Sequence, residues 1–161
     1  QDAVDDGNNM KARADMALGS LYGGLCLGPV NTAAVHALAY PLGGVFKVSH
    51  GVSNSVLLPF VMNFNLPACI ERYAKIGRAM GLADHDSEEM LARSTIAAVR
   101  KLSNRCGIPS SLQELQIPES AIPGMAEAAM EVQRLLGNNP REVTLTDAVA
   151  IYEAAYNGVL D

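Results

Sequence analysis

Apolar and polar residues follow each other along this chain with the period of α-helices. Between Asn9 and Leu27, apolar side chains recur every three or four residues, which is the spacing of one helical face. The members of this stripe are Ala14, Leu18, Leu21, Tyr22 and Leu25. Pro29 is then placed to begin a second helix, because proline suits a first helical turn, and the paired glycines Gly43 and Gly44 would end it.

The middle of the chain predicts three further helices. The third would open at Gly51 and meet Pro59, which should end or kink it. The fourth has an apolar stripe that consists of Cys69, Tyr73, Ile76 and Met80. Asp86 and Glu89 resemble a capping box, in which each side chain bonds to the backbone of the other residue, and they predict the start of the fifth. Its inward positions are Ala92, Ile96, Val99, Leu102 and Cys106.

Shorter helices are predicted in the last third of the sequence. Pro118 begins a single short turn, and Pro123 begins a helix that runs to Gly137. Thr144 and Asp147 cap the last helix. The apolar stripe of that helix consists of Ala148, Ile151, Tyr152 and Ala155. No stretch alternates convincingly with a period of two, so the pattern predicts an all-α fold of about seven helices.

Length and composition fit one such domain and exclude several classes of function. We expect residues 1–161 to form a single compact, bundle-like domain, since 49% of the residues are apolar and 18% are charged. No apolar run reaches the roughly 20 residues that a membrane span needs. The net charge of −5, the scattered basic residues and the absence of tryptophan argue against a nucleic-acid surface. We therefore expect neither a membrane nor a nucleic acid as a partner.

The three cysteines predict a reducing compartment. Cys26, Cys69 and Cys106 are odd in number, widely spaced and placed on apolar helical faces. This pattern is typical of buried free thiols and not of a disulfide or zinc framework. Nothing at the start of the sequence is typical of a signal peptide, so the expected location is the cytoplasm.

Two histidines are the strongest candidates for chemistry. His36 and His50 lie fourteen positions apart on either side of a glycine turn, so both imidazoles could face one point. Two neutral imidazoles suit a divalent transition metal, but a catalytic iron or zinc takes three or four protein ligands. The pair therefore predicts half of a metal site. The alternatives are a core histidine bonded to a carbonyl at position 36 and a helix cap at position 50.

The third histidine, His85, lies between Asp84 and Asp86 in a polar stretch. These three side chains could bind a metal, but a solvated loop before a helix cap is the favoured interpretation. No glycine-rich phosphate loop follows a strand, so the chain carries no dinucleotide fingerprint.

The residues around the histidine pair resemble the signature of iron-containing (group III) alcohol dehydrogenases. The matching segments are His36–Ala39, Pro41–Gly44, His50–Gly51, Asn54, Leu57–Pro59 and Asn65. Further matches follow in order at Arg72–Tyr73, Ala79–Gly81, Gly107–Pro109 and Asn139–Arg141. The resemblance covers nearly the whole chain, and it implies the all-helical C-terminal domain of that family, with dehydroquinate synthase-like architecture.

In this family the metal is held by an aspartate and a histidine one helical turn apart, and by two further histidines. The resemblance matches the latter two to His36 and His50, whereas no Asp-x-x-x-His occurs in the chain. It also implies that the N-terminal α/β domain, which binds NAD or NADP, is absent from these 161 residues. We therefore expect the chain alone to be inactive.

Three more positions take their interpretation from the resemblance. Many members carry a second histidine beside the nicotinamide, four residues after the first ligand, where this chain has Tyr40. Tyrosine could donate a hydrogen bond or stack there, or could be a half-buried packing residue. Leu27 and Leu135 match positions that line the substrate pocket in some members, although leucines are first of all core residues.

The expected function is therefore that of the metal-binding domain of an iron-dependent alcohol dehydrogenase. Such an enzyme transfers a hydride between an alcohol and NAD(P), giving an aldehyde or ketone, with Fe²⁺ or alternatively Zn²⁺ as the metal. A homo-oligomer is compatible with the sequence. Two other interpretations stay open: a freestanding helical binding or assembly protein without redox activity, and a zinc-dependent polyol dehydrogenase.

Overall fold

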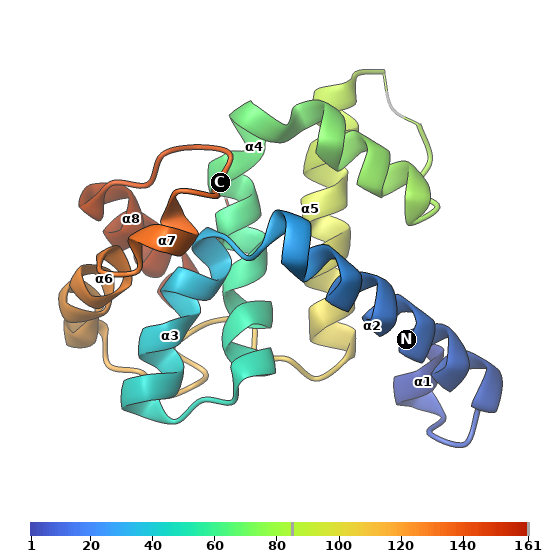
Figure 1. The fold of residues 1–161 in the computed structure, drawn as a ribbon, viewed down its shortest axis with the longest axis horizontal. Helices are drawn as coiled ribbons and strands as arrows, with labels where there is room; N and C mark the ends of the chain where they lie inside the picture. Colours follow the sequence, from blue (N-terminus) through green and yellow to red (C-terminus); the bar gives the residue numbers. More distant parts are fainter. Residues whose placement is uncertain (85, 161) are drawn as a thin grey trace. The chain divides into compact units, whose positions relative to one another are not determined.

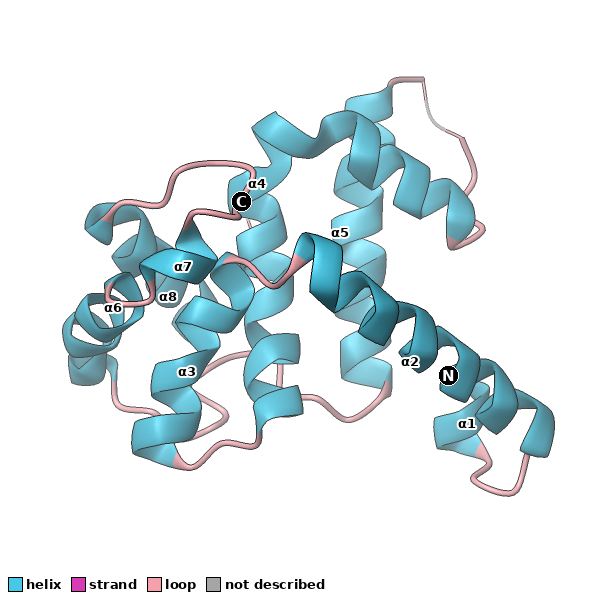
Figure 2. Cartoon of the chain, in the orientation of Figure 1, coloured by secondary structure: helices cyan, strands magenta, loops and turns pink. Residues whose placement is uncertain are grey.

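A computed structural model describes residues 1–84 and 86–160, and within them all regular structure is helical (Figures 1 and 2). The eight α-helices and one 3₁₀-helix of this part are α1 (Asp2–Asp5), α2 (Met10–Val30), α3 (Ala34–Phe46), α4 (His50–Ala79), α5 (Glu88–Arg105), η1 (Glu119–Ala121), α6 (Ile122–Met130), α7 (Gln133–Leu136) and α8 (Leu145–Asn157). The all-α prediction is confirmed. None of the described helices combines the length and the apolarity that crossing a bilayer requires.

The chain divides into two compact units, Gln1–Thr32 and Ala33–Asp161, where a single one was expected. The first unit holds α1 and α2, and the N-terminus of α2 is capped by the Asn9 side chain, which accepts a hydrogen bond from the Ala12 N–H at 3.0 Å. No residue of α2 is buried, so the buried stripe predicted there is wrong. The physical reason is that the four-residue α1 is its one helical neighbour within the unit and is too short to cover it.

The boundary between the first two long helices also differs from the prediction. Pro29 lies inside α2, which ends at Val30, and the next residue, Asn31, leaves the helical conformation with a φ of 64°. The next helix, α3, begins only at Ala34. It continues past Gly43 and Gly44 to Phe46, because the left-handed residue that stops it is Lys47, with a φ of 59°.

The two helices predicted in the middle of the chain are one long helix, α4, which contains Pro59 and Pro67. A proline inside a helix lacks the backbone N–H for one hydrogen bond and clashes with the preceding turn. Where the turns on both sides stay helical, the helix therefore bends at the proline and does not end there. Figure 1 shows α4 changing direction sharply along its length. Of the two outcomes predicted for the helix that meets Pro59, an end or a kink, α4 therefore shows the kink.

Later in the chain, α8 is capped as predicted, whereas the cap of α5 and the extent of the helix expected from Pro123 to Gly137 differ from the prediction. Thr144 and Asp147 form a capping box at α8, as predicted. The cap of α5 is Ser87 and not Asp86, since the Ser87 hydroxyl accepts from the Met90 N–H at 3.2 Å. The single helix expected up to Gly137 is split into α6 and α7 by a turn at Glu131–Val132.

The main core of the second unit lies between α3, α4, α6 and α8. Tyr152 of α8 is completely buried in it and donates a hydrogen bond to the Leu38 carbonyl at 2.6 Å, while burial raises the pKa of its phenol. A smaller cluster lies between the second half of α4 and α5. Cys69 is buried there, as predicted, whereas Cys106 is half-buried and Cys26 is exposed on α2, which contradicts its predicted burial.

Close contact between α4 and α5 depends on Gly77. Thr95 of α5 is fully buried, and its hydroxyl lies 3.0 Å from the Tyr73 carbonyl and 2.8 Å from that of Leu91. A Cβ on Gly77 would collide with this hydroxyl and come within 3.1 Å of Leu91 Cδ1. The two helices can therefore approach this closely only with glycine at position 77.

The Asn139–Arg141 segment is attached to the middle of α4 by side-chain bonds. The amides of Asn139 and Asn65 bond to each other reciprocally at 2.8 and 2.9 Å. Arg141 donates to the Phe64 carbonyl at 2.8 Å, and its guanidinium lies 4.0 Å from the centre of the Phe64 ring. Asn65 is almost fully buried, and both polar atoms of its amide bond to Asn139.

We predict that Gly77→Ala lowers the free energy of unfolding by about 1–3 kcal/mol, because it overpacks the α4–α5 contact. Gly51→Ala in the same helix is the matched control. A Cβ at Gly51 meets no atom within 4 Å, so this change should be neutral or stabilise by up to about 1 kcal/mol. Urea unfolding followed by circular dichroism measures both, and equal effects would refute the close-packing argument.

A second prediction concerns the asparagine pair. Asn139→Ala leaves the buried Asn65 amide without its partner, which should cost about 1–3 kcal/mol of unfolding free energy. The control is Asn157→Ala, since the Asn157 amide bonds to the Glu153 carbonyl at the surface. A loss in the Asn139 variant no larger than in this control would show that the pair does not stabilise the fold.

Candidate metal centre

His36 and His50 are brought together by the reversal between α3 and α4. His36 lies in the first turn of α3, and His50 is the first residue of α4. Between them, the left-handed Lys47 turns the chain, and the Val48 N–H already bonds back to the Leu42 carbonyl at 3.2 Å. The two imidazole centroids lie 5.2 Å apart, with their planes tilted by 54°. The two imidazole rings therefore lie close together, as the sequence predicted.

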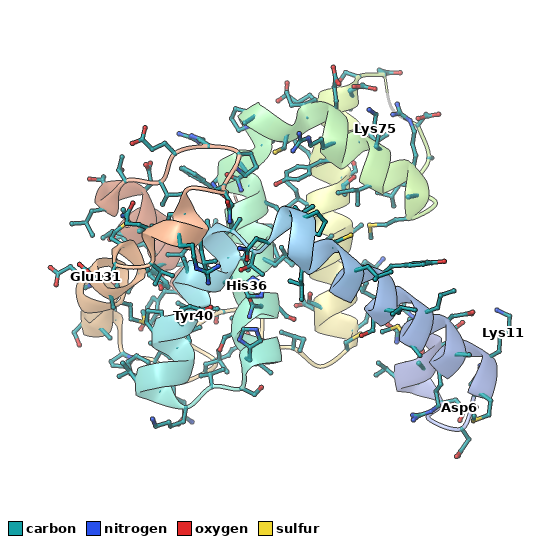
Figure 3. All side chains as sticks on the ribbon, in the orientation of Figure 1. Asp6, Lys11, His36, Tyr40, Lys75 and Glu131 are labelled. Atoms are coloured by element: carbon teal, nitrogen blue, oxygen red, sulfur yellow. The ribbon has the colours of Figure 1, made fainter. Side chains whose placement is uncertain are left out.

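The surroundings of His36 favour its neutral form. Its side chain is half-buried on α3 (Figure 3), and burial lowers the pKa of its imidazole below the usual value, with a smaller contribution from the nearby His50. A neutral imidazole keeps a nitrogen lone pair available at neutral pH. The pair therefore offers nitrogen donors rather than two repelling cations.

Asn54, one helical turn after His50, is a neighbour that the sequence did not single out as a site residue. Its amide nitrogen donates to the His50 carbonyl at 2.9 Å and lies 3.3–3.4 Å from both nitrogens of the His50 ring. Its Oδ1 atom is buried and has no hydrogen-bond partner among the described residues. The four-residue spacing on a helix was the signal that could have revealed this neighbour.

The pair fits a divalent transition metal but does not complete its coordination. Iron and zinc accept imidazole nitrogen, and a Zn–N distance of about 2.0–2.1 Å allows two rings at this separation to bind one ion. Within the described residues, no group of three or more His, Cys, Asp or Glu side chains could hold a metal ion. The described residues therefore supply two nitrogen donors at this point, and the half-site stays a prediction.

The other predicted site residues are placed as follows. Tyr40 lies one turn after His36 on α3 (Figure 3), and 45% of its surface is exposed, which leaves its hydroxyl accessible. Leu135 of α7 is completely buried in the main core. Leu27 belongs to α2 in the first unit, where its side chain is exposed. His85 lies outside the described residues.

Comparison with known proteins gives the chain a family. Residues 1–156 match the Fe-containing alcohol dehydrogenase family, C-terminal. Long-chain-alcohol dehydrogenase 1 of Geobacillus thermodenitrificans is 40% identical over 159 residues, which are 98% of this chain and 40% of that protein. 1,3-Propanediol dehydrogenase of Klebsiella pneumoniae is 38% identical over 159 residues, 96% of this chain and 40% of that protein.

Solved structures give the same result. The crystal structure of a 1,3-propanediol oxidoreductase matches 96% of this chain and 40% of its own, with a TM-score of 0.92 and 39% identity. An alcohol dehydrogenase from Oenococcus oeni matches with a TM-score of 0.90 and 35% identity, over the same shares of the two chains. The chain spans about 40% of the length of these relatives. It belongs to the iron-containing alcohol dehydrogenase family and corresponds to the C-terminal, all-helical part of it.

Proposed function

We propose that this chain is the metal-binding, substrate-side domain of an iron-dependent alcohol dehydrogenase. The enzyme would transfer a hydride between an alcohol and NAD or NADP, with an aldehyde or ketone as the oxidised product. The observation that carries the proposal is the pair of facing imidazoles, His36 and His50, in a chain that matches this family. The relatives are named for long-chain alcohols and 1,3-propanediol, so we propose an alcohol or aldehyde as substrate, without assigning its chain length.

Each residue of the site has a distinct role in this proposal. His36 and His50 would hold Fe²⁺, or alternatively Zn²⁺, through neutral ring nitrogens. The bound ion would supply Lewis-acid chemistry, which polarises the alcohol oxygen and lowers its pKa. Asn54 would help to position the His50 ring, since its amide nitrogen bonds to the His50 backbone carbonyl and lies 3.3–3.4 Å from both ring nitrogens.

Tyr40 and the leucines would act around the reacting centre rather than on the metal. The exposed Tyr40 hydroxyl could donate a hydrogen bond on the nicotinamide side, but it cannot relay a proton near neutral pH as histidine does. For Leu27 and Leu135 the substrate-pocket role stays a prediction of the family resemblance, since Leu135 is completely buried in the main core and Leu27 is exposed on α2 of the first unit.

The remaining metal ligands and the nucleotide-binding domain would lie outside these 161 residues. This part of the proposal rests on the incomplete ligand set of the described residues and on the 40% share of the relatives that the chain spans. The intact polypeptide in the source cells, detected with an antibody to this chain, should then be at least about twice as large as this one. Alcohol-dependent NAD(P) reduction should be found on that polypeptide, and a species of only this size would contradict the proposal.

Metal binding by the isolated chain gives the first direct test. We predict weak binding of Zn²⁺, used as a redox-stable probe, and its loss in His36→Ala and in His50→Ala, since each removes one of two donors. His85→Ala is the matched control and should bind Zn²⁺ like the parent chain. Isothermal titration measures all four proteins. Tight stoichiometric binding that survives both changes would refute the half-site.

The lowered pKa of His36 predicts a pH dependence of the metal-free fold. The folded chain binds fewer protons than the unfolded chain, whose histidine titrates near pH 6.5, so the free energy of unfolding rises with pH across that range. The stability should be fully present above about pH 6.5 and should fall as the pH drops below it. Urea midpoints with a chelator, from pH 5 to 8, test this, and His36→Gln should flatten the dependence. An unchanged pH dependence in the variant would exclude His36 as its origin.

A further inference from the structure

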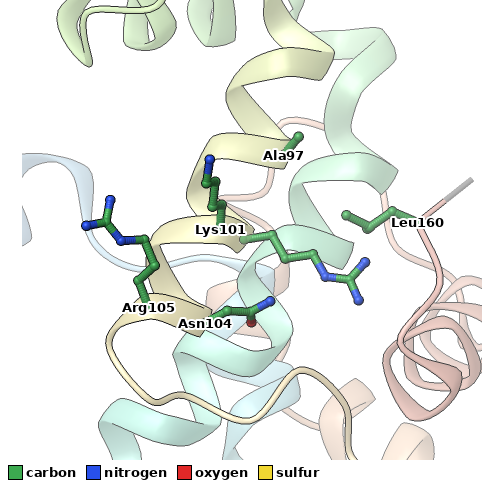
Figure 4. Close-up of a pocket in the computed structure, with 6 residues that line it drawn as sticks. Ala97, Lys101, Asn104, Arg105 and Leu160 are labelled. Atoms are coloured by element: carbon green, nitrogen blue, oxygen red, sulfur yellow. The ribbon is translucent and has the colours of Figure 1, made fainter.

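An open groove of about 590 Å³ lies between the last two turns of α5 and the C-terminal segment. Its lining consists of Ala97, Arg100, Lys101, Asn104, Arg105 and Leu160 (Figure 4). The α5 members recur every three or four residues and so share one helical face. Figure 4 shows Lys101 and Arg105 extending from α5 and Leu160 on the segment across from them. The groove shares no residue with the histidine pair.

The charge of this groove stands out against the rest of the chain. Three of the 12 basic residues of an acidic protein gather here within six positions. Lys101 and Arg105 are like charges one helical turn apart, which by itself destabilises a helix by a few tenths of a kcal/mol. In the part of the chain that the structure describes, the ion pairs of basic residues involve Lys11, Arg78 and Arg93 but none of these three cations. The negative end of the α5 dipole favours a cation at Arg105, but it does not explain why three cations line one groove.

One of the three cations is held in a fixed position. Arg100 is half-buried, donates a hydrogen bond to the Gly158 carbonyl, and lies 5.7 Å from the centre of the Phe60 ring. These contacts order its guanidinium before any ligand arrives, which lowers the entropy cost of binding. Lys101 and Arg105 are exposed, and in Figure 4 their charged ends point away from Leu160, so both side chains would have to turn toward a ligand.

We propose that this groove binds a small organic anion, whose carboxylate or phosphate head contacts Arg100, Lys101 and Arg105. The volume lies in the range of small-molecule sites, about 300–1,000 Å³, and is larger than an inorganic phosphate needs. The apolar body of the ligand packs on Leu160 and Ala97 and on the methylene stems of the basic side chains. The Asn104 amide donates to a head-group oxygen. This proposal is independent of the metal site.

The test uses the whole chain with two amphipathic anions, decanoate and decyl phosphate, as probes. Saturable binding of either one, with NMR shifts confined to residues 97–105 and Leu160, is expected, and the tighter of the two identifies the head group. Decanol, which lacks the charge, and inorganic phosphate, which lacks the apolar body, should each bind at least about tenfold more weakly. Failure of both anions to bind saturably, or equal binding of decanol, overturns the proposal.

Charge-reversal variants locate the binding. Lys101→Glu with Arg105→Glu should weaken anion binding by at least about tenfold, because two attractive contacts become repulsive. The matched control is Arg72→Glu with Lys75→Glu, which changes the net charge equally at two exposed basic residues of α4. This control should change the affinity less than about twofold. An equal loss in both variants would mean that only the overall charge matters, which overturns the groove as the site.

Discussion

The reversal of the chain between α3 and α4 is the constraint on which the candidate site depends. Lys47 adopts the left-handed conformation, and the bond from the Val48 N–H to the Leu42 carbonyl turns the chain back along α3 before α4 begins. The buried Ser53 hydroxyl then bonds to the Ser49 carbonyl at 3.1 Å and fixes the first turn of α4. Because this backbone is held on both sides, the start of α4 places His50 opposite His36.

The close approach of the His36 and His50 rings has an electrostatic consequence. The pKa of His36 is lowered by burial, because an imidazolium loses hydration there, and to a smaller extent by repulsion from His50, whose ring centroid lies 5.2 Å away. His36 therefore keeps a ring-nitrogen lone pair available near neutral pH, which a divalent metal would need from it. Beside His50, the buried Oδ1 atom of Asn54 has no hydrogen-bond partner among the described residues.

The sequence predicted the all-α class, the capping box of α8 with its four buried residues, and the identity of the two facing histidines. These features depend on local periodicity and on short motifs. The boundaries of α2, α3 and α4 could not be predicted, because prolines at 29, 59 and 67 lie inside helices that tertiary contacts or flanking turns maintain. The exposure of Cys26 and the role of Asn54 were also missed, since each depends on which residues a helix meets in space and not on its own spacing.

A single helix connects the metal half-site to the rest of the second unit. α4 presents His50 at its start, receives Asn139 and Arg141 at its middle, and meets α5 at Gly77 near its end. Its bend directs the second half toward α5, so the prolines that would break an isolated helix here give one element two packing faces. The position of His50 is thus set by contacts along the whole of α4, whereas that of His36 is set by the burial of α3 around Leu38 and Tyr152. The described contacts that hold the two histidines lie within the second unit.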